Sequence, residues 1–98
     1  MKILTIGRKG TDIVLEDPNK QISRLHAELT VADNGKYYLV DCGSSNGTSV
    51  KRDGSWQPVK QDYVQLGEEI RFGGFYSATV NELLDKAQLG AAAYKTNV

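Results

Sequence analysis

Residues 23–31, SRLHAELTV, decide the fold of this chain, because their second half alternates strictly between apolar and polar side chains. Ala27, Leu29 and Val31 fall on one face of an extended backbone, and the polar residues between them fall on the other. Successive side chains of a β-strand point to opposite faces, so this pattern indicates a strand with one buried and one solvated face. The preceding SRLH is then expected in a loop that leads into the strand.

Outward from this segment, the chain consists of short runs rich in β-branched and aromatic residues. These runs predict strands at 1–6, 12–15, 27–31, 37–42, 48–52, 63–66, 69–72 and 76–80. Pairs of residues that tolerate a positive φ angle predict turns between them, at Asn34-Gly35, Asn46-Gly47, Asp53-Gly54 and Gly73-Gly74. Many short strands with close turn signals favour an all-β sandwich or barrel.

The C-terminal end has a different composition. Residues 81–94 are rich in Leu, Ala, Glu and Lys and lack β-branched side chains. Asn81 is a candidate N-cap of a short helix that Gly90 would end. We therefore expect a domain over residues 1–83 and a helical or disordered tail over 84–98. Of the two alternatives for the tail, a docking helix or the start of a linker, we favour the linker or a frayed helix, since termini are seldom ordered unless they are held by contacts.

The length, charge and cysteine content of the chain argue against several classes of function. The chain has 98 residues, enough for one domain, and its 12 basic and 12 acidic residues give no net charge. This balance argues against nucleic acid and membrane surfaces as partners, although residues 1–24 carry a small local excess of positive charge. Cys42 is the only cysteine, so no internal disulfide forms and a reducing compartment fits. We expect a cytoplasmic monomer without a membrane-spanning segment.

Three short motifs follow one another along the chain at predicted strand ends. They are Gly7-Arg8, then Ser23-Arg24-Leu25-His26-Ala27, then Ser45-Asn46-Gly47-Thr48. Together, and in this order, they resemble the forkhead-associated (FHA) domain family, and the resemblance covers residues 1–83. It implies an FHA-type β-sandwich of two twisted, mostly antiparallel sheets with the binding loops at one end.

The resemblance also implies a function, which is binding of phosphothreonine in a partner protein that a Ser/Thr kinase has phosphorylated. The positions that contact phosphate in the family are Arg8, Ser23 and Ser45 here, with Arg24 as a secondary contact. The family's asparagine that binds the peptide backbone is Asn46. Such an assignment suits the chemistry, because a phosphate with nearly two negative charges needs a fixed cation and several donors.

Other positions would support the site rather than contact the ligand. The matching residues are Gly7, His26, Gly47 and Thr48, and in the family the histidine is buried and braces the loops. Selectivity three residues after the phosphothreonine is usual in the family. Gln21 and the turn at 73–75 are candidates for the surface that provides it. We expect Ser44 to be an ordinary loop serine, and Lys51 and Arg52 to be a solvated strand end.

Two other classes of protein were weighed. A hydrolase built on Ser23, His26 and Asp41 is rejected, because nothing in the sequence indicates an oxyanion site or a substrate pocket. With one histidine and one cysteine, no metal or cofactor is expected. A phospho-independent scaffold that binds its partner through a sheet face or through the hairpin of Trp56 remains the alternative. An intact anion-binding set argues against it, since a scaffold does not need one.

Overall fold

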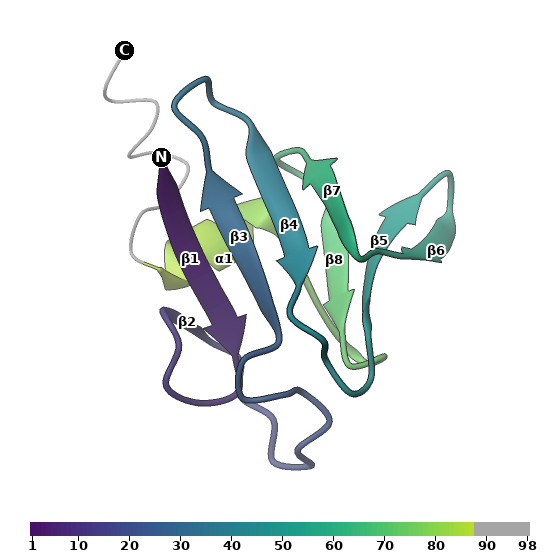
Figure 1. The fold of residues 1–98 in the computed structure, drawn as a ribbon. Helices are drawn as coiled ribbons and strands as arrows, with labels where there is room; N and C mark the ends of the chain where they lie inside the picture. The colour runs from purple at the N-terminus through teal and green to yellow at the C-terminus, as the bar shows by residue number, and fades with distance from the viewer. Residues whose placement is uncertain (88–98) are drawn as a thin grey trace.

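The computed structural model describes residues 1–87, which form two β-sheets and one helix (Figure 1). The predicted sandwich is confirmed, with nine strands in the described residues and no closed barrel. The elements are β1 (Lys2–Gly7), β2 (Ile13–Val14), β3 (Ala27–Val31), β4 (Tyr37–Asp41), β5 (Thr48–Arg52), β6 (Ser55–Pro58), β7 (Gln61–Val64), β8 (Glu69–Phe72), β9 (Tyr76–Thr79) and α1 (Val80–Lys86).

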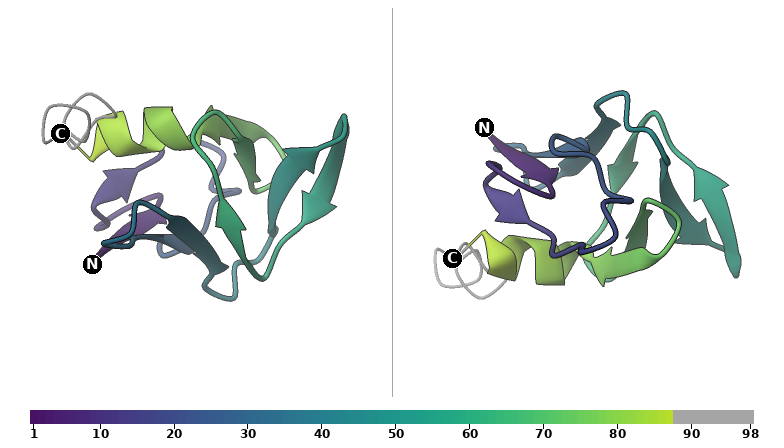
Figure 2. Two further views of the ribbon diagram at one scale, coloured as in Figure 1. Left: turned by 90° about the horizontal axis from the view of Figure 1, so that it is seen from above. Right: turned by 90° about the horizontal axis from the view of Figure 1, so that it is seen from below.

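The strands pair in two separate sheets. The first has the order β2-β1-β3-β4-β7 and the second the order β6-β5-β8-β9. All neighbours are antiparallel except β1 and β2, which pair in parallel through Ile6 and Ile13. The two sheets face each other as the layers of a sandwich, as Figure 2 shows.

The core lies between the sheets and follows from the alternation in the sequence. Ala27 and Leu29 of β3 are fully buried, and the polar residues between the buried positions are half-exposed. The second sheet contributes Ile70 and Phe72 of β8, which are fully buried as well. Fully burying one large aliphatic or aromatic side chain contributes roughly 1.5–3 kcal/mol, so this layer of apolar contacts holds the two sheets together.

Arg52, at the end of β5, links the second sheet to β7 of the first sheet. The guanidinium of Arg52 donates to Asp62 over 2.7 Å, to Glu68 over 3.1 Å and to the carbonyl of Tyr63 over 2.8 Å. The interpretation of Arg52 as a solvated strand end is therefore wrong. Its acceptors lie 10 to 16 residues further along the chain, where no local pattern reveals them.

The helix α1 starts earlier than the sequence suggests. Thr79, not Asn81, is the N-cap, and Thr79 and Glu82 form a reciprocal capping box. The side chain of Asn81 instead accepts a hydrogen bond from the backbone of Gly67 over 2.7 Å. In Figure 2, α1 continues from β9 and lies opposite β1 and β3 across the core.

The helix is docked, not a free linker. Val80, Leu83 and Leu84 are fully buried, and their spacing places them on one helical face. The preference for a linker or frayed helix is thus wrong for residues 81–87, because burial of Leu83 and Leu84 ties this part of the chain to the core. Gly90 and the rest of the predicted tail lie outside the described residues.

Truncating this apolar face should destabilise the whole domain. We expect Leu84→Ala to lower the free energy of unfolding by about 2–5 kcal/mol, the range for deletion of a buried leucine side chain. Urea unfolding followed by circular dichroism measures this change. Lys86→Ala, at an exposed position of the same helix, should change stability by less than about 0.5 kcal/mol. Equal stabilities of the two variants would show that α1 does not contribute to the core.

Candidate functional site

The three sequence motifs meet at one end of the sandwich. They lie on the β1–β2 loop (residues 8–12), the β2–β3 loop (15–26) and the β4–β5 loop (42–47), which all gather at the lower end of Figure 1. The β8–β9 turn (73–75) lies at the same end. Segments far apart in the sequence therefore form one continuous surface of loops.

His26 holds two of these loops together from beneath. Its ring is fully buried, and its Nδ1 accepts a hydrogen bond from the backbone N–H of Ser23 over 3.1 Å. Its Nε2 lies 2.8 Å from the carbonyl oxygen of Gly47. Since Nδ1 accepts, the imidazole carries its proton on Nε2 and donates it to Gly47. The edge of Phe72 packs against the ring at a centroid distance of 5.6 Å.

Gly7 is required because the β2–β3 loop passes directly over the end of β1. A Cβ atom at this position would lie 1.8 Å from the carbonyl oxygen of Arg24, a distance that no side chain can accept. The neighbouring backbone N–H of Arg8 donates to the carbonyl of Ser23 over 3.1 Å, and that of His26 donates to Ile6 over 2.8 Å. The expected supporting role of Gly7 therefore has a steric basis in this close approach.

Arg8 is half-buried and is held by only one of its nitrogens. Its Nε donates to the carbonyl of Ile22 over 3.0 Å, which fixes the direction of the guanidinium. Its two terminal nitrogens have no acceptor within residues 1–87, and it forms no ion pair there. The side chain thus offers an oriented and uncompensated positive charge at the loop surface.

Ser23, Ser45 and Asn46 lie on the β2–β3 and β4–β5 loops, and the first of these loops accepts the hydrogen bond from Arg8. The backbone N–H of Ser45 donates to the hydroxyl of Ser23 over 3.1 Å, so the two loops contact each other directly. The amide of Asn46 donates to the carbonyl of Gln21 over 2.8 Å and also approaches the Gln21 side chain at 3.3 Å. The Ser23 hydroxyl accepts this bond, and its own O–H has no acceptor within the described residues. The Oδ1 of Asn46 has no donor there either.

Asp41 organises the β4–β5 loop, a role that the sequence analysis missed. It accepts hydrogen bonds from the backbone N–H of Ser44 over 3.0 Å and from the hydroxyls of Ser44 and of Thr48, the latter over 2.6 Å. The Ser44 hydroxyl in turn accepts from the N–H of Gly47 over 3.0 Å. Ser44 is therefore a structural residue of this loop, and its hydroxyl is engaged within the loop.

The carboxylate of Asp41 responds to these contacts. Partial burial raises its pKa, but the hydrogen bonds from Ser44 and Thr48 lower it by more, so its pKa lies below the ordinary 3.8. An aspartate followed three residues later by serine is a familiar loop-initiating pattern, which offered a weak signal in the sequence.

Asp17 organises the β2–β3 loop by hydrogen bonds, as Asp41 does for the β4–β5 loop. Asp17 is buried, and its carboxylate accepts from the backbone N–H groups of Asn19, over 3.1 Å, and of Ile22. No motif of the sequence had assigned a role to Asp17. Its carboxylate fixes Ile22, the residue whose carbonyl orients Arg8.

The geometry does not support a catalytic triad. The histidine ring contacts the backbone of Ser23, not its hydroxyl, and its other nitrogen is occupied by Gly47. The carboxylate of Asp41 is directed to Ser44 and Thr48. These three side chains therefore form no proton relay.

The two elements that were candidates for selectivity lie next to each other. The backbone N–H of Gly73 donates to Gly47 over 3.0 Å, and a Cβ at Gly73 would lie 2.8 Å from the carbonyl oxygen of Gln21. Phe75, at the tip of the β8–β9 turn, is about half exposed. Gln21 and this turn thus border the loop surface on the side of Asn46.

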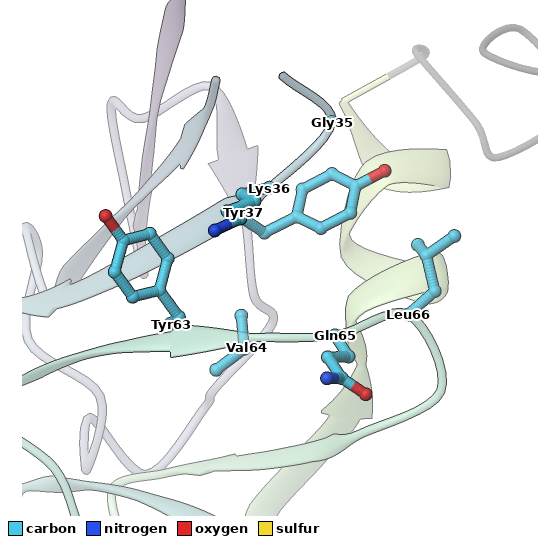
Figure 3. Close-up of a pocket in the computed structure, with 7 residues that line it drawn as sticks. All are labelled: Gly35, Lys36, Tyr37, Tyr63, Val64, Gln65 and Leu66. Carbon is cyan, nitrogen blue, oxygen red and sulfur yellow. The ribbon is translucent and has the colours of Figure 1, made fainter. Parts of the chain in front are cut away.

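The site is a surface of loops and not the pocket shown in Figure 3. That pocket has a volume of about 580 Å³ and is lined by Gly35, Lys36, Tyr37, Tyr63, Val64, Gln65 and Leu66. Its residues come from β4, β7 and the turns beside them, at the end of the sandwich away from the loop motifs. None of the residues singled out for the site lines it.

Two further features concern metals and membranes. No group of three or more His, Cys, Asp or Glu side chains in residues 1–87 is arranged to hold a metal ion. In the same part of the chain, no helix has the length and apolar character needed to cross a membrane.

The fold and the loop cluster together define a small β-sandwich recognition module. The family model for the FHA domain matches residues 4–73. This chain therefore belongs to the FHA domain family.

Two regulatory proteins are among its relatives. The oxoglutarate dehydrogenase inhibitor of Corynebacterium efficiens is 40% identical over 72 residues, which cover 72% of this chain and 46% of the relative. The glycogen accumulation regulator GarA of Mycobacterium tuberculosis is 38% identical over 74 residues, which cover 74% of this chain and 41% of that protein. The chain thus spans less than half the length of these curated relatives.

Solved FHA domains share the fold. The FHA domain of FhaA, complexed with the intracellular domain of another protein, superposes with a TM-score of 0.60 at 32% identity, covering 72% of this chain and 71% of that one. The N-terminal FHA domain of Rad53p from S. cerevisiae, in complex with a phosphothreonine peptide, gives a TM-score of 0.56 at 26% identity, with coverages of 70% and 54%.

Removing the buried histidine should loosen the loop cluster and weaken the fold at once. We expect His26→Ala to lower the melting temperature, because it leaves a cavity and frees both the N–H of Ser23 and the carbonyl of Gly47. Differential scanning calorimetry measures the shift. Gln57→Ala, at an exposed position of β6, is the control and should leave the melting temperature nearly unchanged. An unaltered melting temperature for His26→Ala would show that the ring does not brace the loops.

The Asp41 network should give a pH-dependent contribution to stability. A folded-state pKa below the unfolded value of about 3.8 means that the stabilisation is complete at higher pH and is lost as the pH falls through the folded pKa. The difference in urea midpoint between the native chain and Asp41→Asn should therefore be constant from pH 7 to 5 and shrink below about pH 3.8. A difference that stays the same down to pH 3 would contradict this account.

Proposed function

We propose that this domain binds phosphothreonine-containing segments of partner proteins, and that the phosphate sits on the β1–β2, β2–β3 and β4–β5 loops. The observation that carries the proposal is the half-held guanidinium of Arg8. Its Nε is occupied by Ile22, whereas its terminal nitrogens point to no acceptor within residues 1–87. A planar fork of free N–H donors matches two phosphate oxygens.

The hydroxyls beside it complete the set of donors. The Ser23 hydroxyl accepts from the N–H of Ser45 and therefore directs its own proton elsewhere, toward a bound phosphate in this proposal. The exposed hydroxyl of Ser45 is a further donor, from the β4–β5 loop. Arg24 is exposed and forms no ion pair in the described residues, which suits a secondary contact.

Asn46 would bind the peptide backbone next to the phosphothreonine. Its Oδ1 is available to accept a peptide N–H, while its Nδ2 is held by Gln21 and so keeps the amide plane fixed. An extended peptide would then lie across the loop tips and reach Gln21 and the exposed Phe75. Those two residues are the proposed source of selectivity beyond the phosphothreonine.

The expected affinity is moderate. Each charge-assisted hydrogen bond contributes roughly 1.5–3 kcal/mol net. Three or four such bonds, less the entropy lost by a flexible peptide, correspond to a Kd of about 1 μM. Such an affinity suits reversible signalling downstream of a Ser/Thr kinase.

The biological role that we infer is regulatory and not enzymatic. Relatives of this chain are named as an inhibitor of a dehydrogenase and as a regulator of glycogen accumulation. We infer that this domain acts as a monomer in the cytoplasm and recruits a phosphorylated partner. The absence of a proton relay among Ser23, His26 and Asp41 supports a binding role.

A titration against peptide pools tests the proposed function directly. The domain is titrated with degenerate phosphothreonine, phosphoserine and unphosphorylated peptides, and binding is followed by calorimetry. Saturable binding to the phosphothreonine pool, with little response to the other two, is the expected result. Equal binding to all three pools would refute phosphothreonine recognition.

Replacing the proposed phosphate ligand should abolish most of this affinity. Arg8→Ala is expected to weaken phosphopeptide binding by about 10- to 100-fold, the loss of one charge-assisted contact at 1.5–3 kcal/mol. Lys60→Ala removes an exposed cation outside the four loops and should leave the Kd unchanged. An unaltered Kd for a folded Arg8→Ala domain would show that the phosphate binds elsewhere.

A further inference from the structure

A second cationic surface lies on the outer face of the four-stranded sheet. The guanidinium of Arg71 stacks over the ring of Trp56, 4.5 Å from its centroid, and the ammonium of Lys51 lies 5.9 Å from the same centroid. We call these three residues the Trp56 face. They come from β8, β6 and β5, so three adjacent strands build it.

Strand register creates this arrangement. Lys51 is directly opposite Trp56 across the β5–β6 pair. Ser49 is opposite Arg71 on one side and opposite Pro58 on the other. Because Ser49 is small, the long side chain of Arg71 reaches across β5 to the indole. A larger residue at position 49 would block that path.

The two cations are not neutralised by the protein. The ion pairs within residues 1–87 join Arg52 to Asp62 and Glu68, and the N-terminus to Asp33. Neither Lys51 nor Arg71 takes part in them. The Nε of Arg71 is covered and has no acceptor, so the guanidinium is held by stacking and its charge is uncompensated.

The position of this face favours contact through side chains. The β5–β6 hairpin projects from the body of the sandwich, as both views of Figure 2 show. A strand from a partner protein is not expected to pair with the open edge of β6, because Pro58 has no N–H to donate. The bond from Val59 N–H to Thr48 confirms that this end of β6 is already paired with β5 on its other side.

We propose that the Trp56 face is a second binding site, which takes an acidic segment of a partner protein independently of the phosphothreonine site. Carboxylates of the segment pair with Lys51 and Arg71, and its apolar stems pack on the exposed part of the indole. A protein segment fits better than nucleic acid, since two cations on a chain of zero net charge cannot neutralise a run of phosphates.

Trp56 is the only tryptophan of the chain, so its intrinsic fluorescence reports on this face alone. The native domain is titrated with a deca-glutamate peptide and, in parallel, with deca-glutamine. We expect a saturable change in tryptophan emission with deca-glutamate only, which weakens when salt is raised from low to about 0.5 M because exposed charges are screened. Anisotropy of a fluorescein-labelled deca-glutamate gives a second readout that does not depend on the indole.

The double variant Lys51→Gln/Arg71→Gln should weaken binding by about 5- to 20-fold, as expected for two exposed ion pairs. The matched control Lys36→Gln/Lys86→Gln removes the same charge from other elements and should bind as the native chain does. Arg71→Lys should retain part of the affinity, which separates loss of charge from loss of packing. Arg8→Ala should bind deca-glutamate normally, so failure of the phosphothreonine site and failure of this one are distinguishable.

Several results would overturn the proposal. They are an equal response to deca-glutamine, equal weakening by the control pair, and no saturable response in either readout. Binding of a ten-nucleotide oligothymidylate that depends on Lys51 and Arg71, without binding of deca-glutamate, would assign the face to nucleic acid instead.

Discussion

The hydrogen bonds of one buried imidazole hold the functional end of this sandwich in place. His26 accepts from the backbone of Ser23 at one nitrogen and donates at the other to the backbone of Gly47, 21 positions further along the chain, so two loops share one rigid support. Only the neutral ring with its proton on Nε2 can satisfy both partners. A protonated ring would turn a donor toward the donor of Ser23, and the support would fail.

The loops above this support are ordered by their own carboxylates. Asp17 fixes the β2–β3 loop and Asp41 fixes the β4–β5 loop, each by accepting several hydrogen bonds from its own segment. Arg8 and Ser23 are consequently held before any ligand arrives. A preorganised surface loses less conformational entropy on binding, which is how a small domain without a deep pocket binds a short peptide. The acidic groups of these loops therefore serve the geometry of the site.

The strands could be predicted from the sequence where burial follows alternation, as in β3, β5 and β8, whose bounds agree with the predicted runs. β6 was not among those runs, because its sequence SWQP shows no alternation of apolar and polar residues. It forms a strand because the Asp53-Gly54 turn brings it alongside β5. Arg52 and the docked α1 were misjudged for a related reason, since their partners are set by tertiary contacts that no local pattern contains. The motifs predicted which residues gather at the loop end, but not that Asp17 and Asp41 hold them there.

The four arginines show why uncompensated charge is informative in this chain. Arg52 is saturated by two carboxylates and a carbonyl, and it closes the sandwich. Arg8 uses one nitrogen to bind the backbone and leaves its other nitrogens without an acceptor, whereas Arg71 stacks on an indole and forms no ion pair within residues 1–87. Arg24 is exposed at the loop end. Arg8 and Arg71 are thus each held in place by a neighbour without forming an ion pair in residues 1–87, and both positions suit an anionic ligand.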